Sequence, residues 1–233
     1  MKLNFLKNFF NKKIAKQLRK PSGALANKVG NGMNKSNNFL YHFTMEAMQP
    51  VNNESILEIG FGNGKFFDKL FSRAKNLQIS GLDFSPEMVK EATVNNPATS
   101  SSGQLTLRLG SSDNIPFPDN SFDKVFCINV IYFWEQPAGH LKEISRVLKP
   151  GGRFYTSVRS KESLAQMPFA KYGFTIYSQD EWIHVLESNG LTYLHTKKTE
   201  NEPDAEFDRQ VYKMESYCIV AEKAGNKFHN GQP

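Results

Sequence analysis

Hydrophobic and polar positions follow two different periods along the chain. Short apolar runs of strand length recur between segments whose apolar residues are spaced three or four apart, as on one helix face. Strands are predicted at 55–60, 78–83, 105–109, 124–129, 153–158, 191–198 and 214–222. Helices are predicted at 36–48, through 66–71, at 86–94, at 137–148 and at 178–189. Strands that alternate with helices in this way predict an α/β fold with a largely parallel sheet.

Local signals mark where several of these elements begin and end. Ser85 before Pro86 predicts an N-terminal helix cap, and Ser178 three residues before Glu181 predicts a capping box. The mostly polar stretch 95–103 is predicted as a loop.

The first predicted strand runs directly into a turn that holds Gly60, Gly62 and Gly64. The second strand ends in Asp83, 19 residues after the last of these glycines. Residues without side chains let a backbone approach a ligand closely, and a carboxylate at the next strand end can accept hydrogen bonds from two ribose hydroxyls. This arrangement predicts a site for an adenosine-type ligand.

The glycine spacing excludes two of the common nucleotide motifs. A dinucleotide fingerprint requires glycine where Lys65 stands. A phosphate-binding P-loop requires glycine and a hydroxyl residue where Ile59 and Phe66 stand. The remaining pattern, E-x-G-x-G-x-G from Glu58 to Gly64, resembles the first motif of class I S-adenosylmethionine-dependent methyltransferases.

Further segments resemble the same family, in the same order, over residues 50–158. The stretch 110–123 is similar to the family segment G-D-A-x-x-L-P-F-x-D-x-S-F-D, and 148–154 to its L-K-P-G-G-x-L/F turn. The resemblance implies a Rossmann-like, seven-stranded, mostly parallel sheet with an antiparallel C-terminal hairpin, helices on both faces and a helical N-terminal arm or lid. The small-molecule group typified by ubiquinone/menaquinone C-methyltransferases is the most similar.

This resemblance also implies the cofactor, S-adenosylmethionine, and residues that bind it. The three glycines would pass beneath the methionine portion, with Glu58 ordering their loop through backbone N–H groups. Asp83 would bind the ribose, and Asn129 would face the methionine end. Either Phe84 or Met88 would lie against the adenine. The family commonly has aspartate where this chain has Ser111. Serine can accept one hydrogen bond but carries no charge, so adenine recognition is expected to depend also on backbone atoms of Ser112 or on Asp113.

Methyl transfer from a sulfonium mainly requires alignment of the acceptor and exclusion of water, so no catalytic base is assigned. Four side chains are candidates to reach the acceptor, each with packing as the alternative role: Tyr41, His42, Tyr132 and His140. An apolar acceptor pocket is expected from two covering segments, one with Phe39, Tyr41, Phe43 and Met48, the other with Leu164, Met167, Phe169, Tyr172, Phe174 and Tyr177. They favour an aromatic or lipophilic acceptor, methylated at carbon or oxygen.

A length of 233 residues suits one large domain. We expect a basic helical arm and lid at 1–49, a methyltransferase domain at 50–223 and a flexible tail at 224–233. No apolar run is long enough to span a membrane, and Cys127 and Cys218 fall in predicted strands as buried thiols, which predicts a cytoplasmic protein. No spacing of Cys or His suggests a metal site.

The net charge of +6 is concentrated at the N-terminus. Nine of the 29 Lys and Arg residues, and none of the 23 Asp and Glu residues, lie in 1–45, so the remainder has 20 against 23 and a net charge of −3. Leu3, Leu6, Phe10, Ile14 and Leu18 share one predicted helix face, and lysines lie largely opposite. The arm could cover the sheet, lie on an anionic membrane or contact nucleic acid. The acidic residues of 200–208 argue against a nucleic acid substrate on that side.

Two other functions remain open from the sequence. The first is a methyltransferase that acts on RNA or protein and uses the basic arm as a tether. The second is a non-catalytic module that binds an adenosyl ligand, which the serine at position 111 keeps open. Oligomeric state and acceptor identity are not predicted.

Overall fold

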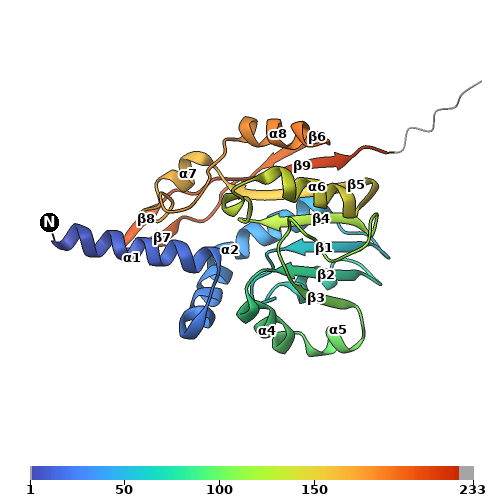
Figure 1. Ribbon diagram of the computed structural model, residues 1–233, viewed down its shortest axis with the longest axis horizontal. Coiled ribbons are helices and arrows are strands. Elements are labelled where there is room, and N and C mark those ends of the chain that lie inside the picture. Colours follow the sequence, from blue (N-terminus) through green and yellow to red (C-terminus); the bar gives the residue numbers. More distant parts are fainter. Residues whose placement is uncertain (1, 226–233) are drawn as a thin grey trace, which may run out of the picture.

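A computed structural model describes residues 2–225, with side chains from Leu6 onward. Most of the expected tail, 226–233, and the side chains of Lys2 and Leu3 lie outside the described residues. Seven strands form one sheet in the order β3-β2-β1-β4-β5-β9-β6 (Figure 1). Their bounds are β1 Ser55–Ile59, β2 Gln78–Asp83, β3 Leu105–Leu109, β4 Phe122–Ile128, β5 Leu148–Arg159, β6 Leu191–Lys198 and β9 Ser216–Lys223.

The first five strands pair in parallel, and β9 pairs antiparallel with both β5 and β6. The expected fold class, with its antiparallel C-terminal pair, is therefore confirmed. The longer helices are α1 Lys2–Arg19, α2 Ala26–Met48, α4 Pro86–Asn95, α6 Pro137–Val147 and α8 Gln179–Ser188. The short ones are η1 Gly23–Leu25, α3 Phe67–Phe71, α5 Pro97–Ser101, η2 Ile131–Phe133 and α7 Lys161–Ala165.

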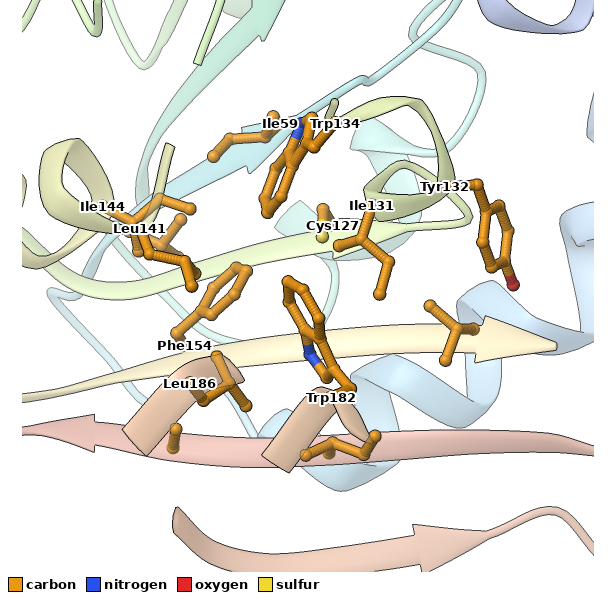
Figure 2. Close-up of a cluster of buried hydrophobic side chains, with 14 of the residues drawn as sticks. Ile59, Cys127, Ile131, Tyr132, Trp134, Leu141, Ile144, Phe154, Trp182 and Leu186 are labelled. Carbon is orange, nitrogen blue, oxygen red and sulfur yellow. The ribbon is translucent and has the colours of Figure 1, made fainter. Parts of the chain in front are cut away.

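Alternation along the strands produces a hydrophobic core on each face of the sheet. In β1, Leu57 and Ile59 belong to the core that α6 and α8 cover, whereas Ile56 belongs to the core that α2 and α3 cover. Figure 2 shows the first core, where Phe154 of β5 and Trp182 of α8 point into the same cluster as residues of α6. Glu58 shares its strand face with Ile56, and this places its side chain toward α2.

The segment before β1 contains more helix than the sequence predicted. The helix expected at 36–48 begins ten residues earlier, at Ala26. Its first turns are rich in Asn and Gly, which have low helix propensity, so the pattern did not reveal them. Tertiary contacts stabilise them instead: Gly30 lies close to Met88, and Asn34 Nδ2 donates to Asn63 Oδ1 at 3.0 Å.

The apolar face expected for the N-terminal arm is only partly buried. Ile14 and Leu18 pack against the core, together with the buried Ala15. In contrast, Leu6 and Phe10 are exposed, because that half of α1 extends past the sheet (Figure 1). The apolar face of α1 therefore packs on the fold only through its C-terminal half.

Other differences lie in the connections. The expected loop at 95–103 contains the short helix α5, which begins at Pro97, a residue favoured at the first helical position. The segment between β6 and β9 contains the two-stranded hairpin β7 Ala205–Phe207 and β8 Gln210–Tyr212. The capping box at Ser178 and Glu181 is present as predicted, as is the cap at Ser85.

Candidate functional site

The carboxyl ends of the central strands surround a cavity of about 440 Å³. Its lining comes from the residues that follow β1, β2, β3 and β4, and from the N-terminal segment, which closes one side. A volume of this size lies within the roughly 300–1,000 Å³ of small-molecule and cofactor sites. Many of the polar and glycine residues predicted for the site line this cavity: Gly60, Gly62, Asp83, Ser111, Ser112, Asp113, Asn129 and His140.

The turn after β1 has the backbone that its glycines suggest. Gly60, Gly62 and Gly64 have φ of +75°, +59° and +69°, values that favour glycine. A Cβ on Gly60 would lie 2.5 Å from Val130 Cγ2, and one on Gly64 would lie 2.8 Å from Ala92 Cβ. A Cβ on Gly62 would meet nothing within 4 Å. Gly60 thus permits close packing against the loop after β4, and Gly64 permits packing against α4.

Asp83 joins the glycine turn to the start of α4. Its Oδ2 accepts the Gly62 N–H at 2.9 Å, and its Oδ1 accepts the Ser85 N–H at 2.9 Å. Burial raises the pKa of this carboxyl to about 6, although the two backbone donors act in the opposite direction. A carboxylate has about four lone-pair sites, so each oxygen can accept one more hydrogen bond from a ligand in the cavity. Asp83 therefore fits the ribose of an adenosyl group.

Glu58 contacts α2 rather than the glycine loop. Tyr41 Oη donates to Glu58 Oε2 at 3.3 Å, so the expectation that Glu58 accepts backbone N–H groups is wrong for the described residues. Both side chains line a second cavity of about 30 Å³. It shares five lining residues with the larger one: Met33, Asn37, Gly60, Gly62 and Ile128. Burial raises the pKa of Glu58 to about 8, and the negative charge of Asp83 adds to this effect.

We expect the free energy of unfolding to decrease as the pH rises, because Glu58 is buried and loses its proton. Its folded pKa of about 8 lies above the ordinary 4.5, so the folded state holds this proton more tightly than the unfolded chain does. The resulting stabilisation is complete below pH 4.5 and is lost as the pH approaches 8. Thermal unfolding of wild-type protein and Glu58→Gln between these values tests this: the variant should lose less stability. Parallel curves would contradict the assignment.

The other end of the cavity is formed by residues after β2 and β3. Phe84 is 36% exposed and Met88 is fully buried, and both line the cavity. Ser111 is exposed at the cavity, whereas the buried Ser112 has its Oγ 2.8 Å from His140 Nδ1. His140 also stacks on Trp134, with ring centroids 4.6 Å apart, and burial lowers its pKa. This end offers flat apolar surfaces and hydroxyl groups, which suit a planar base.

Asn129 links the loop after β4 to α2. Its Nδ2 donates to Asn37 Oδ1 at 2.9 Å, and its Oδ1 accepts from Tyr132 Oη at 3.1 Å. Tyr132 Oη in turn accepts the Arg159 N–H at 2.5 Å, and burial raises the pKa of this tyrosine. Since Tyr132 is buried behind Asn129 and lines neither cavity, its contacts position Asn129 rather than reach a ligand.

Several residues predicted to form or line the site lie elsewhere. His42 lines neither cavity, and its Nε2 is 2.7 Å from Lys69 Nζ. Of the residues expected to line an apolar acceptor pocket, Tyr41 alone lines one of the two cavities. The others pack into, or against, the hydrophobic cores, except Phe39, which is half-buried. The residues in or against the cores are Phe43, Met48, Leu164, Met167, Phe169, Tyr172, Phe174 and Tyr177.

Several residues of the N-terminal segment line the site although no sequence pattern singled them out. Leu18, Arg19 and Pro21 line the large cavity, and Met33 and Asn37 of α2 face both cavities. Arg19 Nη1 pairs with Glu135 Oε1 at 3.2 Å, and Pro21 O accepts from Ser85 Oγ at 2.7 Å. No sequence spacing links these residues to strands far along the chain. The only available signal was the lack of acidic residues in this segment.

Three further structural findings concern metal ligands, thiols and membrane-spanning helices. Within 2–225, no group of three or more His, Cys, Asp or Glu side chains is placed to hold a metal ion. The thiols of Cys127 and Cys218 are free and buried in the sheet. None of the helices in the described part of the chain is both long enough and apolar enough to cross a membrane.

Comparisons with known proteins agree with this geometry. A family model described as a methyltransferase domain matches residues 57–156. The uncharacterized methyltransferase YdaC of Bacillus subtilis is 30% identical over 131 residues, which cover 56% of this chain and 70% of YdaC. The ubiquinone/menaquinone biosynthesis C-methyltransferase UbiE of Geotalea daltonii is 33% identical over 112 residues, and the match spans 48% of each chain.

The fold is also shared with solved structures. A chain in the complex between the Haloferax volcanii Trm112 methyltransferase activator and a methyltransferase superposes with a TM-score of 0.71 at 24% identity. That match covers 86% of this chain and 96% of the other. The glycine turn, Asp83 and the loop after β4 all fall within the segment that the family model matches. Together with the similarity to YdaC, this shows that the chain belongs to the methyltransferase family.

Proposed function

We propose that the large cavity binds S-adenosylmethionine and that the protein transfers its methyl group to a small organic acceptor. The observation that carries this proposal is the position of Asp83 beside the cavity. Its carboxylate is oriented by two backbone N–H groups and keeps acceptor capacity on the cavity side. When bound, this cofactor supplies a methyl group already activated by its positive sulfur.

The residues of the chain would serve mainly to bind and orient. Gly60 and Gly62 allow the backbone of the turn to approach the methionine portion. Asn129, oriented by Asn37 and Tyr132, presents polar atoms at the same end. Helix α2 lies over this end and limits the access of water. Alignment and exclusion of water are the main requirements for an in-line displacement.

The acceptor is proposed to be aromatic or lipophilic and to be methylated at carbon or oxygen. The lining near Asn129 is largely apolar, with Met33, Ile128, Val130 and Phe133. The printed name of the UbiE relative describes a C-methyltransferase of quinone biosynthesis, which supports an acceptor of this kind. The small cavity beside Glu58 holds about two water molecules at most. We therefore propose that the acceptor shares the large cavity with the cofactor.

Calorimetric titration with S-adenosylmethionine, with NAD as the control ligand, tests the cofactor. We expect micromolar binding of the first ligand and none of the second, because the turn lacks the dinucleotide spacing. Equal binding of both, or binding of neither in the presence or absence of acceptor candidates, would contradict the proposed site.

The acceptor is tested by transfer of a labelled methyl group to a panel of phenols, quinols, RNA and protein. Turnover on a small lipophilic compound supports the proposal. Transfer to RNA or protein alone would support the tethered alternative. Tight cofactor binding without turnover on any member of the panel would favour a non-catalytic ligand-binding module. In that case Ser111→Asp would be the first substitution to examine, because the family commonly has aspartate at this position.

A further inference from the structure

The outward face of α1 carries three large apolar side chains in contact with solvent. Leu6, Phe9 and Phe10 are 62%, 64% and 60% exposed. They lie within five residues on the half of α1 that extends past the sheet (Figure 1). Large exposed apolar side chains that gather in one patch mark a surface for association with a membrane or a protein.

The rest of the helix is held firmly in place. Ala15 is buried in the core, with Ile14 and Leu18 packed beside it. Lys7 pairs with Asp208 of the turn between β7 and β8 at 2.9 Å, and Arg19 pairs with Glu135. Since these contacts fix the rotation of α1, the side chains of Leu6, Phe9 and Phe10 are presented outward and are not available to the core of their own chain.

Lysines continue the same outward face. Positions 6, 9, 10, 13 and 16 share one side of a helix, because 6, 9, 13 and 16 are three or four apart and 10 lies three before 13. Lys13 and Lys16 are exposed there. Lys12 is exposed at the edge of this face. None of these three lysines forms an ion pair with a carboxylate among the described residues, whereas Lys20, which follows α1, lies over the ring of Phe84.

We propose that this face of α1, formed by Leu6, Phe9, Phe10, Lys12, Lys13 and Lys16, docks on an anionic phospholipid surface. Helices with a basic polar part and exposed Phe and Leu bind membrane interfaces, where lysines meet anionic headgroups and the apolar side chains enter the boundary with the acyl chains. The lysines favour a negatively charged surface. The exposed phenylalanines favour a surface with an apolar layer into which their rings can insert. Nucleic acid has the negative charge but no apolar layer for the phenylalanines, so a phospholipid surface fits this face better.

The acidic residues of 202–208, in and just before the β7–β8 hairpin, do not oppose this contact. Asp208 is in the ion pair with Lys7, and other carboxylates of this stretch are also in ion pairs. Asp204 pairs with Lys213, and Glu202 pairs with Arg159.

Docking would also place a membrane next to the candidate site. The C-terminal end of α1 contributes Leu18 and Arg19 to the large cavity. A lipophilic acceptor dissolved in the bilayer would then be concentrated beside the cavity. This enrichment of the acceptor rests on the proposed function, whereas the docking itself does not.

Flotation of the full chain with vesicles tests the docking. We expect binding to vesicles of phosphatidylcholine mixed with phosphatidylglycerol, weak binding to phosphatidylcholine alone, and weaker binding as salt rises. Phe9→Asp with Phe10→Asp should lower the partition coefficient by about tenfold or more. Lys12→Ser, Lys13→Ser and Lys16→Ser together should lower it by about fivefold per lysine at low salt.

Matched surface changes serve as controls. Val94→Asp with Val211→Asp alters two valines that are 71% and 63% exposed elsewhere on the protein. Lys75→Ser, Lys90→Ser and Lys142→Ser removes three exposed lysines outside the arm. Both controls should bind vesicles as the wild type does. Near-UV circular dichroism confirms that each variant folds, as expected for changes in exposed side chains.

Three outcomes would overturn the proposal. The first is no binding to anionic vesicles at low salt by folded wild-type protein. The second is vesicle binding that is unchanged in Phe9→Asp with Phe10→Asp and that RNA inhibits by competition. This result would mean that the helix binds anionic surfaces through its charge alone. The third is a dimer, seen by light scattering, that Phe9→Asp with Phe10→Asp converts to monomer, which would mean that a second copy of the chain covers this face.

Discussion

Replacing Gly60 with alanine is expected to lower the free energy of unfolding by about 2–5 kcal/mol and to abolish measurable cofactor binding. Two costs add together. The φ of +75° costs an L-residue about 1–2 kcal/mol. The new Cβ would also lie 2.5 Å from Val130 Cγ2, and a β-branched side chain cannot easily turn away, so overpacking adds about 1–3 kcal/mol. Chemical denaturation and calorimetry measure the two effects.

Gly103 provides a matched control for Gly60. It has the same φ of +75°, but nothing lies within 4 Å of the position of its Cβ, so Gly103→Ala reports backbone strain without crowding. Val130→Ala removes the methyl group that the new Cβ would meet. The double variant Gly60→Ala with Val130→Ala should therefore regain the stability lost to overpacking, seen as a favourable interaction energy in a double-mutant cycle. If Gly60→Ala destabilises no more than Gly103→Ala, the close approach of the turn to the loop after β4 is incorrect.

Replacing Asp83 with alanine should weaken S-adenosylmethionine binding by about 1.5–3 kcal/mol, the usual worth of hydrogen bonds to a charged group. That is a loss of roughly ten- to hundredfold in affinity. The variant would lose the ribose acceptor and would also release the N–H groups of Gly62 and Ser85. The turn after β1 and the start of α4 would then be less ordered, so the loss should lie toward the upper end of this range.

Calorimetric titration of Asp83→Ala measures the loss, and two variants clarify its origin. Asp83→Asn keeps the shape of the side chain, but its amide N–H₂ must face one of the two backbone donors, so it should also bind weakly. Asp68→Ala removes an exposed carboxylate on α3 and should leave affinity unchanged. A change of less than twofold in Asp83→Ala would exclude Asp83 from cofactor binding.

Local patterns were sufficient for most of the fold. Strand-length apolar runs, the caps at Ser85 and Ser178, and the glycine turn each depend on residues within a few positions of one another. The structure places the predicted strands where the sequence predicted them to within a few residues, apart from β5, which begins five residues earlier because Leu148 also pairs with Phe122. Asp83 could be singled out from sequence because its position depends only on the end of its own strand.

The sequence alone determined the α/β sheet, the turn that only glycine can form and the carboxylate beside it, since these follow from local backbone preferences and from the alternation of buried positions. The tertiary structure alone decided the partners of Glu58 and Asn129 on α2, the burial of the expected acceptor pocket in the two cores, and the outward face of α1. Each of these depends on how a helix is rotated against a distant part of the chain. That rotation is set by the packing of many side chains together, and no single spacing in the sequence records it.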